Sequence, residues 1–157
     1  MGAAERGGRR RPACPACGLV YFASPAVGVA VIVEDERGRV LLGRRARGRH
    51  AGRWCIPCGY VEWGEDVRQA AVREFAEETG LVVELAEVAA VKSNFHDPER
   101  LTVGIWFRGR VRGGTLRPAD GELTELRYVD PARPPQLAFP TDAEVLAELA
   151  ARRTSGQ

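Results

Sequence analysis

The order of apolar segments along this sequence predicts an α+β domain or a layered α/β/α domain. Strand-like segments come first, and an amphipathic helix, further strands and a last helix follow them. The chain has 157 residues, of which 45% are hydrophobic and 28% charged, and this suits one soluble globular domain with a single core. The formal net charge of +2 indicates no overall attraction to nucleic acid or to a membrane surface.

Residues 1–23 are predicted to form a disordered basic tail followed by a short cysteine turn. Four arginines crowd the start of the chain without an apolar run, which is typical of a solvated tail and not of a secretory signal: Arg6, Arg9, Arg10 and Arg11. No segment is apolar over the length of a membrane span. We therefore expect a cytoplasmic protein whose four cysteines are reduced thiols or metal ligands.

The strands are predicted from runs of apolar and β-branched residues. Residues 27–33 read as a buried strand, and residues 40–42 as its partner across a polar turn, so the pair is expected to form a hairpin. Further strands are expected at residues 81–91, 101–111 and 126–129.

Two helices are predicted from their capping residues. Asp66 can cap a helix with an apolar stripe, and Gly80 occupies a position that ends it. Thr141 is expected to cap the last helix, with Glu144 as its capping-box partner, and this helix should run to about Arg152.

Three carboxylates share one face of the first helix. Glu74, Glu77 and Glu78 are spaced i, i+3 and i+4, so their mutual repulsion and the dipole at the helix end both destabilise this face. A bound cation would compensate, and Mg²⁺ prefers such oxygen ligands. The alternative is a solvated acidic face on which Arg73 and Glu77 form an ordinary ion pair.

The residues around this helix resemble the Nudix box. The matching positions are Gly59, Glu65, Arg73, Glu74, Phe75, Glu77, Glu78, Gly80 and Leu81. Residues 40–57 also resemble the segment that leads to the box, and residues 137–142 resemble the tail of family members that act on dinucleotide diphosphates. The resemblance covers most of residues 25–152, and we place the hydrolase domain at residues 24–153.

The resemblance implies an α/β/α sandwich with a mixed central sheet and a site for Mg²⁺ or Mn²⁺. By position, Glu74, Glu77 and Glu78 would be metal ligands, and Glu65 would support the loop or the outer metal shell. Arg73 would orient a carboxylate, and with Glu77 and Glu78 it belongs to the expected catalytic group. Metal ions neutralise charge on phosphoryl oxygens and lower the pKa of an attacking water.

A general base in this family often comes from a later loop. Glu122 is the candidate here and Glu125 the reserve, although both suit ordinary loop charges equally well. The sequence departs from the family at Cys58, where a glycine usually follows the proline, so the turn after Pro57 is expected to adjust.

Four further residues are candidates for substrate binding. Arg44 and Arg45 could clamp a diphosphate, or could simply end an exposed strand. Phe95 could stack on a nucleobase, and His96 could contact substrate or assist proton transfer. A single histidine in a loop often does neither.

The cysteines form two C-x-x-C pairs, Cys14 with Cys17 and Cys55 with Cys58. The first pair resembles half of the N-terminal zinc ribbon of some relatives. Because a structural zinc ion normally takes four ligands, the two pairs would have to combine to hold one. The alternative is a remnant turn with free thiols.

The resemblance implies hydrolysis of the diphosphate linkage in a nucleotide of the ADP-ribose, NADH or FAD type, with release of a nucleoside monophosphate. The alternatives are a house-cleaning nucleoside triphosphate pyrophosphatase and a non-catalytic nucleotide-sensing or zinc-ribbon binding module. The expected partner is a small-molecule nucleotide, with no membrane or nucleic acid, and a homodimer is left open.

Overall fold

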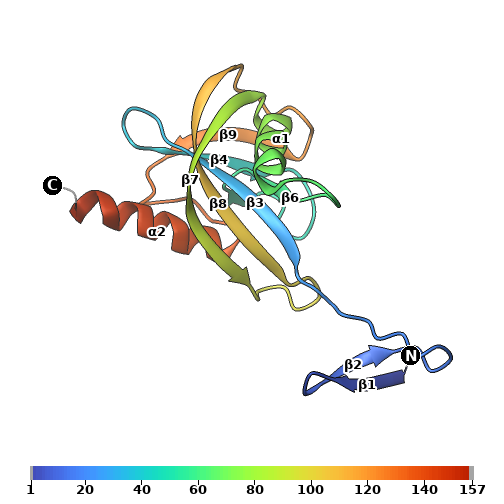
Figure 1. The fold of residues 1–157 in the computed structure, drawn as a ribbon. Helices are drawn as coiled ribbons and strands as arrows, with labels where there is room; N and C mark the ends of the chain where they lie inside the picture. The colour runs from blue at the N-terminus through green and yellow to red at the C-terminus, as the bar shows by residue number, and fades with distance from the viewer. Residues whose placement is uncertain (1, 156–157) are drawn as a thin grey trace.

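The computed structural model describes residues 2–155 and has a central β layer between two helices (Figure 1). The first helix, α1, spans Val67–Thr79 and the second, α2, spans Pro140–Ser155. The layer consists of a four-stranded and a three-stranded sheet, and a separate two-stranded hairpin lies at the N-terminus. This arrangement confirms the predicted α/β/α sandwich. No helix in residues 2–155 has the length and apolar character needed to cross a membrane.

The four-stranded sheet is mixed, as expected. Its strands lie in the order β6 (Cys58–Tyr60), β3 (Ala26–Val33), β8 (Thr102–Gly114) and β7 (Leu81–Asn94). Strand β3 runs parallel to β8 and antiparallel to β6, while β7 and β8 form a long antiparallel pair.

The predicted hairpin between the first two core strands is wrong. Strand β4 (Val40–Arg45) belongs to the three-stranded sheet, between β5 (Trp54–Cys55) and β9 (Leu123–Val129). A single bridge between Glu34 and Val40 joins its start to the end of β3. Both edges of β3 are already paired, with β6 and β8, so β4 must find its partners in the second sheet.

Helix α1 begins and ends where its sequence signals predict. The side chain of Asp66 accepts hydrogen bonds from the backbone N–H groups of Arg68 and Gln69, which is N-cap geometry. Gly80 adopts the left-handed conformation, with φ of 70°, and its N–H donates to the carbonyl of Ala76. Because both ends are fixed, the positions of the acidic residues on the helix are fixed too.

Helix α2 begins two residues earlier than predicted, at Pro140, which is a favoured first residue of a helix. Thr141 therefore lies inside the helix and does not cap it. Glu144, its expected capping partner, instead forms an ion pair of 3.2 Å with Lys92 of β7, and Glu148 adds a second of 2.6 Å. These pairs attach α2 to the sheet.

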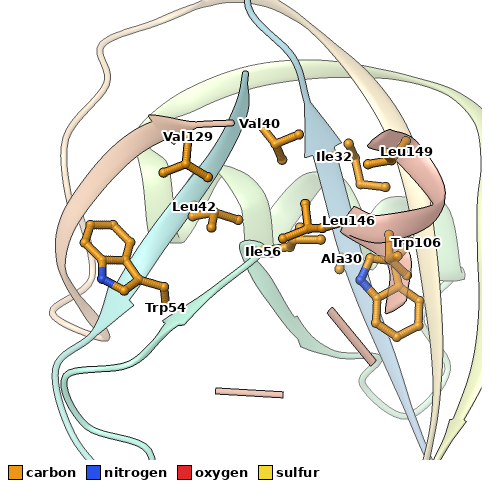
Figure 2. Close-up of a cluster of buried hydrophobic side chains, with 11 residues drawn as sticks. Ala30, Ile32, Val40, Leu42, Trp54, Ile56, Trp106, Val129, Leu146 and Leu149 are labelled. Carbon is orange, nitrogen blue, oxygen red and sulfur yellow. The ribbon is translucent and has the colours of Figure 1, made fainter. Parts of the chain in front are cut away.

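Alternating side chains of β3 fill two cores, one on each side of the β layer. Ala30 and Ile32 face α2 and pack with Leu146, in the cluster that Figure 2 shows. Val29 and Val31 belong to the second cluster, together with Phe75 of α1. The period of two along the strand thus places each helix against its own apolar face.

The disordered tail expected at the start of residues 1–23 differs from the structure over the described residues 2–13. Strands β1 (Gly2–Arg6) and β2 (Arg9–Ala13) pair in antiparallel fashion. Gly7 and Gly8 join them with φ of 59° and 69°, values that suit the tightest hairpin turns. The sequence hides this hairpin because its strands lack the apolar alternation by which strands are recognised.

Candidate active site

Arg73 on α1 holds the acidic residues in place. Its guanidinium donates two hydrogen bonds to the carboxylate of Glu65, at 2.8 and 2.9 Å. It also donates to Glu74 at 2.8 Å, to Glu77 at 3.2 Å and to the carbonyl of Tyr60 at 3.2 Å. One side chain therefore connects the helix, the preceding loop and β6.

The pKa values reflect this connection. The hydrogen bonds from Arg73 lower the pKa of Glu65 to about 2, and the backbone N–H of Glu62 contributes in the same direction. The same ion pairs raise the pKa of Arg73. Glu65 is thus a permanent anion that orients Arg73, which in turn orients Glu74 and Glu77.

Glu78 is the most deeply buried of the acids, with 1% of its surface exposed. Its Oε2 accepts a 2.8 Å hydrogen bond from the backbone N–H of Cys58, but its Oε1 is buried without a hydrogen-bond partner among the described residues. Burial raises the pKa of Glu78 well above the usual carboxyl value. Because the contact at Cys58 uses its backbone, the departure from glycine at this position leaves it intact.

Glu74 lies directly over the backbone of Gly59. A Cβ atom at position 59 would sit 2.0 Å from Cδ of Glu74, so only glycine leaves room for this carboxylate. Burial raises the pKa of Glu74, hydrogen bonds from Arg73 lower it, and the charges of Glu77 and Glu122 raise it. The loop and the helix are therefore in close contact at the site.

Glu122 faces these acids from the loop before β9. Its charge raises the pKa of both Glu74 and Glu78, which places it within electrostatic reach of each. Glu125, the reserve candidate, lies 3.9–4.0 Å from Arg127 and Arg44. Of the two, Glu122 is therefore the one that meets the acidic face.

The residues present fit a divalent cation. Within residues 2–155, no three His, Cys, Asp or Glu side chains are already gathered around a single metal position. The buried and unpartnered Oε1 of Glu78 is nevertheless a costly arrangement without a cation, and Glu74 and Glu77 share its helix face. A hard cation with oxygen ligands, such as Mg²⁺, satisfies this set.

A pocket of about 390 Å³ adjoins the acidic residues. Cys58, Gly59 and Glu122 line it on the acidic side. Its other walls carry cationic and aromatic side chains, namely Arg45, Arg49, His50, Tyr60, His96, Arg100, Trp106 and Phe139. A volume of this order is typical of small-molecule sites.

Phe139 contacts three other side chains of this pocket. The sequence did not indicate it as a site residue. His50 packs against its ring at 5.5 Å and His96 at 5.7 Å, while the guanidinium of Arg45 lies 5.3 Å from its centre. The four side chains come from three different loops and from β4, so only the folded chain brings them together.

The structure separates the four predicted substrate residues into two groups. Arg45 and His96 line the pocket. Arg44 instead donates to the carbonyl of Gly52, and Phe95 is 72% exposed; neither lines the pocket. The expected Arg44–Arg45 clamp is therefore not formed, because the two side chains leave β4 in different directions.

Asp142 was also missed as a site residue. It lines the pocket from α2 and is only 2% exposed. Its carboxylate accepts two hydrogen bonds of 3.0 Å, one from the indole N–H of Trp106 and one from the backbone N–H of Ile56. Burial raises its pKa to about 7, although these two hydrogen bonds act in the opposite direction.

The two cysteine pairs do not meet in the structure. Cys55 is buried in the core and Cys58 packs against the same cluster. Cys14 and Cys17 directly follow β2 in the sequence, and the hairpin of β1 and β2 lies apart from the β layer (Figure 1). The expected four-cysteine zinc site is therefore not assembled, because the core strands β5 and β6 fix one pair where the other does not reach.

Comparison with known proteins gives consistent matches. The NUDIX domain model matches residues 24–149. An ADP-ribose pyrophosphatase from Methanocaldococcus jannaschii is 36% identical over 119 residues, which cover 75% of this chain and 69% of that protein. An NAD-capped RNA hydrolase from Chromobacterium violaceum is 33% identical over 127 residues, which cover 81% of this chain but only 46% of that protein.

Among solved structures, a NUDIX hydrolase from Nitrosomonas europaea superposes with a TM-score of 0.84 at 31% sequence identity. The match covers 99% of this chain and 88% of that one. It therefore includes the N-terminal hairpin region as well as the sandwich.

Proposed function

The chain belongs to the NUDIX family of hydrolases, and from that premise we propose that it cleaves the diphosphate linkage of a nucleoside diphosphate derivative. The proposed substrates are of the ADP-ribose, NADH or FAD type. Water adds across one P–O–P bond, so that a nucleoside monophosphate leaves with one phosphate and the second group keeps the other.

The proposed metal ligands are Glu74, Glu77 and Glu78, and the unpartnered Oε1 of Glu78 supports this assignment. Bound Mg²⁺ or Mn²⁺ would neutralise charge on the phosphoryl oxygens and lower the pKa of the attacking water. Glu65 acts through Arg73, which it orients by two hydrogen bonds. Both are positioning residues in this proposal.

Glu122 is proposed to accept the proton of the attacking water. It lines the pocket and lies within electrostatic reach of Glu74 and Glu78. Proton removal by Glu122 would make the water a better nucleophile towards phosphorus.

One observation carries the proposal: residues that adjoin the acidic face also line the basic, aromatic pocket. Gly59 contacts Glu74 on one side and lines the pocket on the other. A diphosphate next to the acidic residues would therefore place its organic groups against Arg45 and Phe139. The names of the two relatives, ADP-ribose pyrophosphatase and NAD-capped RNA hydrolase, support a substrate with two groups joined through phosphate.

The test is product analysis with a substrate panel. Purified protein is incubated with Mg²⁺ and, separately, with ADP-ribose, NADH, FAD and a deoxynucleoside triphosphate, and the products are identified by phosphorus NMR. We expect AMP and ribose 5-phosphate from ADP-ribose. Glu78→Gln, prepared in parallel, should lose about a hundredfold or more of this activity and so controls for contaminating enzymes.

Three outcomes would contradict the proposal. Orthophosphate as the sole product would show a different bond cleavage. Pyrophosphate released only from the triphosphate would favour the house-cleaning alternative. Full turnover in excess chelator would exclude the metal site.

A further inference from the structure

The N-terminal hairpin carries a concentration of positive charge that the proposed hydrolysis does not use. Strands β1 and β2 lie apart from the β layer, joined to it by the segment that leads into β3 (Figure 1). The hairpin has one acidic residue, Glu5, and four arginines, Arg6, Arg9, Arg10 and Arg11. The near-neutral overall charge of the chain conceals this local excess.

The strand register divides the arginines between two faces. Arg6 pairs with Arg9, and Ala4 pairs with Arg11. Between these pairs, Glu5 is the partner of Arg10. Cross-strand partners point to the same face, and successive pairs alternate between faces. Arg6, Arg9 and Arg11 therefore share one face with no acid, while Arg10 shares the other with Glu5.

The cationic face has no internal charge partner. Within residues 2–155, none of its three arginines forms an ion pair. Arg6 and Arg9 are exposed at the turn. Three like charges on one small face repel one another, and an anionic partner would relieve that repulsion.

An aromatic side chain lies next to this face. The guanidinium of Arg11 stacks over the ring of Phe22, 4.6 Å from its centre. Phe22 is 58% exposed. The adjacent Tyr21 lies opposite Pro12, to whose carbonyl its backbone N–H donates, and so belongs to the other face. The hairpin and its return segment thus present cations and an open aromatic ring side by side.

We propose that this face binds single-stranded nucleic acid, with phosphates at Arg6 and Arg9 and a base at Phe22. Single strands are bound in this way because arginines attract the backbone and aromatic rings stack on unpaired bases. In a duplex the bases stack on one another, so no unpaired base is available to stack on the aromatic ring. This proposal departs from the expectation of no nucleic-acid partner, which rested on the net charge of the whole chain.

The hairpin joins the sandwich beside the pocket. The backbone N–H of Ala26, at the start of β3, donates to the carbonyl of Leu101 at 3.0 Å. The preceding residue, Arg100, lines the pocket and stacks over Tyr60. A strand bound at the hairpin would therefore be anchored at the pocket end of the molecule. The binding itself does not require that the proposed hydrolysis be correct.

The test measures binding of a fluorescent oligothymidylate, about 15 nucleotides long, to the full chain by anisotropy at about 0.1 M salt. The variant Arg6→Gln/Arg9→Gln should weaken binding by about tenfold or more and make its salt dependence shallower. The matched control is Arg10→Gln/Arg152→Gln, which removes the same charge from the opposite hairpin face and from α2. It should bind nearly as well as wild type.

A third variant separates nucleic acid from other anions. Phe22→Leu should weaken oligonucleotide binding by roughly fivefold, since one stacking partner is lost, and should leave binding of inorganic polyphosphate unchanged. Circular dichroism checks that each variant is folded. Hydrolysis of ADP-ribose, where it is observed, should be unaffected in all three.

Several results would overturn the proposal. One is absence of binding by the wild-type chain, and another is an equal loss in the matched control, which would indicate non-specific charge attraction. Unchanged oligonucleotide binding in Phe22→Leu would show that the face binds any polyanion and does not recognise bases. Binding of phosphatidylglycerol vesicles that depends on Arg6 and Arg9, without oligonucleotide binding, would assign the face to a membrane surface.

Discussion

The backbone N–H of Cys58 donates a hydrogen bond of 2.8 Å to Oε2 of Glu78, while Oε1 of the same carboxylate is buried without a partner among the described residues. One carboxylate oxygen of Glu78 therefore has a hydrogen-bond partner in the protein, and the other has none among the described residues. A buried ionised carboxylate without full compensation destabilises the folded state. We infer that the site is built for a positive ligand at the expense of metal-free stability.

Glu78→Gln should have opposite effects on activity and on metal-free stability. With Mg²⁺, kcat should fall by about a hundredfold or more, because phosphoryl transfer depends on electrostatic positioning. Without metal, the free energy of unfolding near pH 8 should rise by about 1 kcal/mol, since glutamine removes a carboxyl group whose ionisation the burial disfavours. Kinetics with Mg²⁺ and denaturant unfolding in EDTA measure the two effects.

The stability gain should depend on pH. Burial raises the pKa of Glu78 above its unfolded value, so wild type loses stability as pH rises from the ordinary carboxyl range through that raised pKa. Glutamine does not titrate, and the gain should vanish at acidic pH. Glu36→Gln, in the exposed turn after β3, is the control and should change neither quantity. A near-wild-type kcat in Glu78→Gln would remove Glu78 from the site.

Local signals made the helix and its acidic face predictable from sequence. Asp66 and Gly80 fix the two ends of α1, and the spacing of Glu74, Glu77 and Glu78 then follows from helix geometry. These residues lie within one short segment, so no knowledge of distant contacts is needed. The bidentate contact of Arg73 with Glu65 was not predicted, because it joins the helix to the loop before it.

Features that depend on distant partners were not predictable. Strand β4 pairs with β9 and β5 because the edges of those strands are free. No pattern within the sequence of β4 indicates these partners. The pocket is similar, since Phe139 and His50 come from different loops. Asp142 reads from sequence as an ordinary helix-start acid, and only its burial under Trp106 distinguishes it.

Gly59→Ala should impair catalysis more than folding. The new Cβ would lie 2.0 Å from Cδ of Glu74, so this carboxyl group must move away. Since the end of the side chain can shift, the fold should survive, but a displacement of about 1 Å at a catalytic group can cost about a hundredfold. We expect kcat to fall by about tenfold to a hundredfold, with a weaker response to Mg²⁺ in a titration.

Gly113→Ala is the matched control for this substitution. Gly113 lies in β8, and no atom lies within 4 Å of the position where its Cβ would be built. The activity of the Gly113→Ala variant should remain close to that of wild type. Equal activity of both alanine variants would show that the contact between Gly59 and Glu74 has no part in catalysis.

Arg45→Gln and Arg44→Gln should differ although the residues are adjacent. Arg45 lines the pocket, so its guanidinium can donate to a substrate oxygen there. Arg44 is already bonded to the carbonyl of Gly52. Arg45→Gln should raise KM by about tenfold, the cost of one charged hydrogen bond, and Arg44→Gln should change it by about twofold or less. Similar KM values would contradict this assignment.

Asp142→Asn should cost less stability as pH rises. Burial raises the pKa of Asp142 to about 7, so the folded protein retains a proton that the unfolded chain has lost above its ordinary value of 3.8. Wild-type stability attributable to this group is therefore present at low pH and is lost as pH rises from about 4 through about 7, by on the order of a few kcal/mol. Asparagine does not titrate, but its amide group cannot accept from both Ile56 and Trp106, so the variant is less stable than protonated wild type.

Unfolding in EDTA at about pH 5 and about pH 8 measures the stability difference between wild type and Asp142→Asn. The contribution of Glu78 is common to both proteins and cancels. Asp130→Asn, on the surface, should show the same small difference at both pH values. A cost of Asp142→Asn that does not change between the two conditions would mean that Asp142 is ionised throughout, despite its burial beneath the pocket.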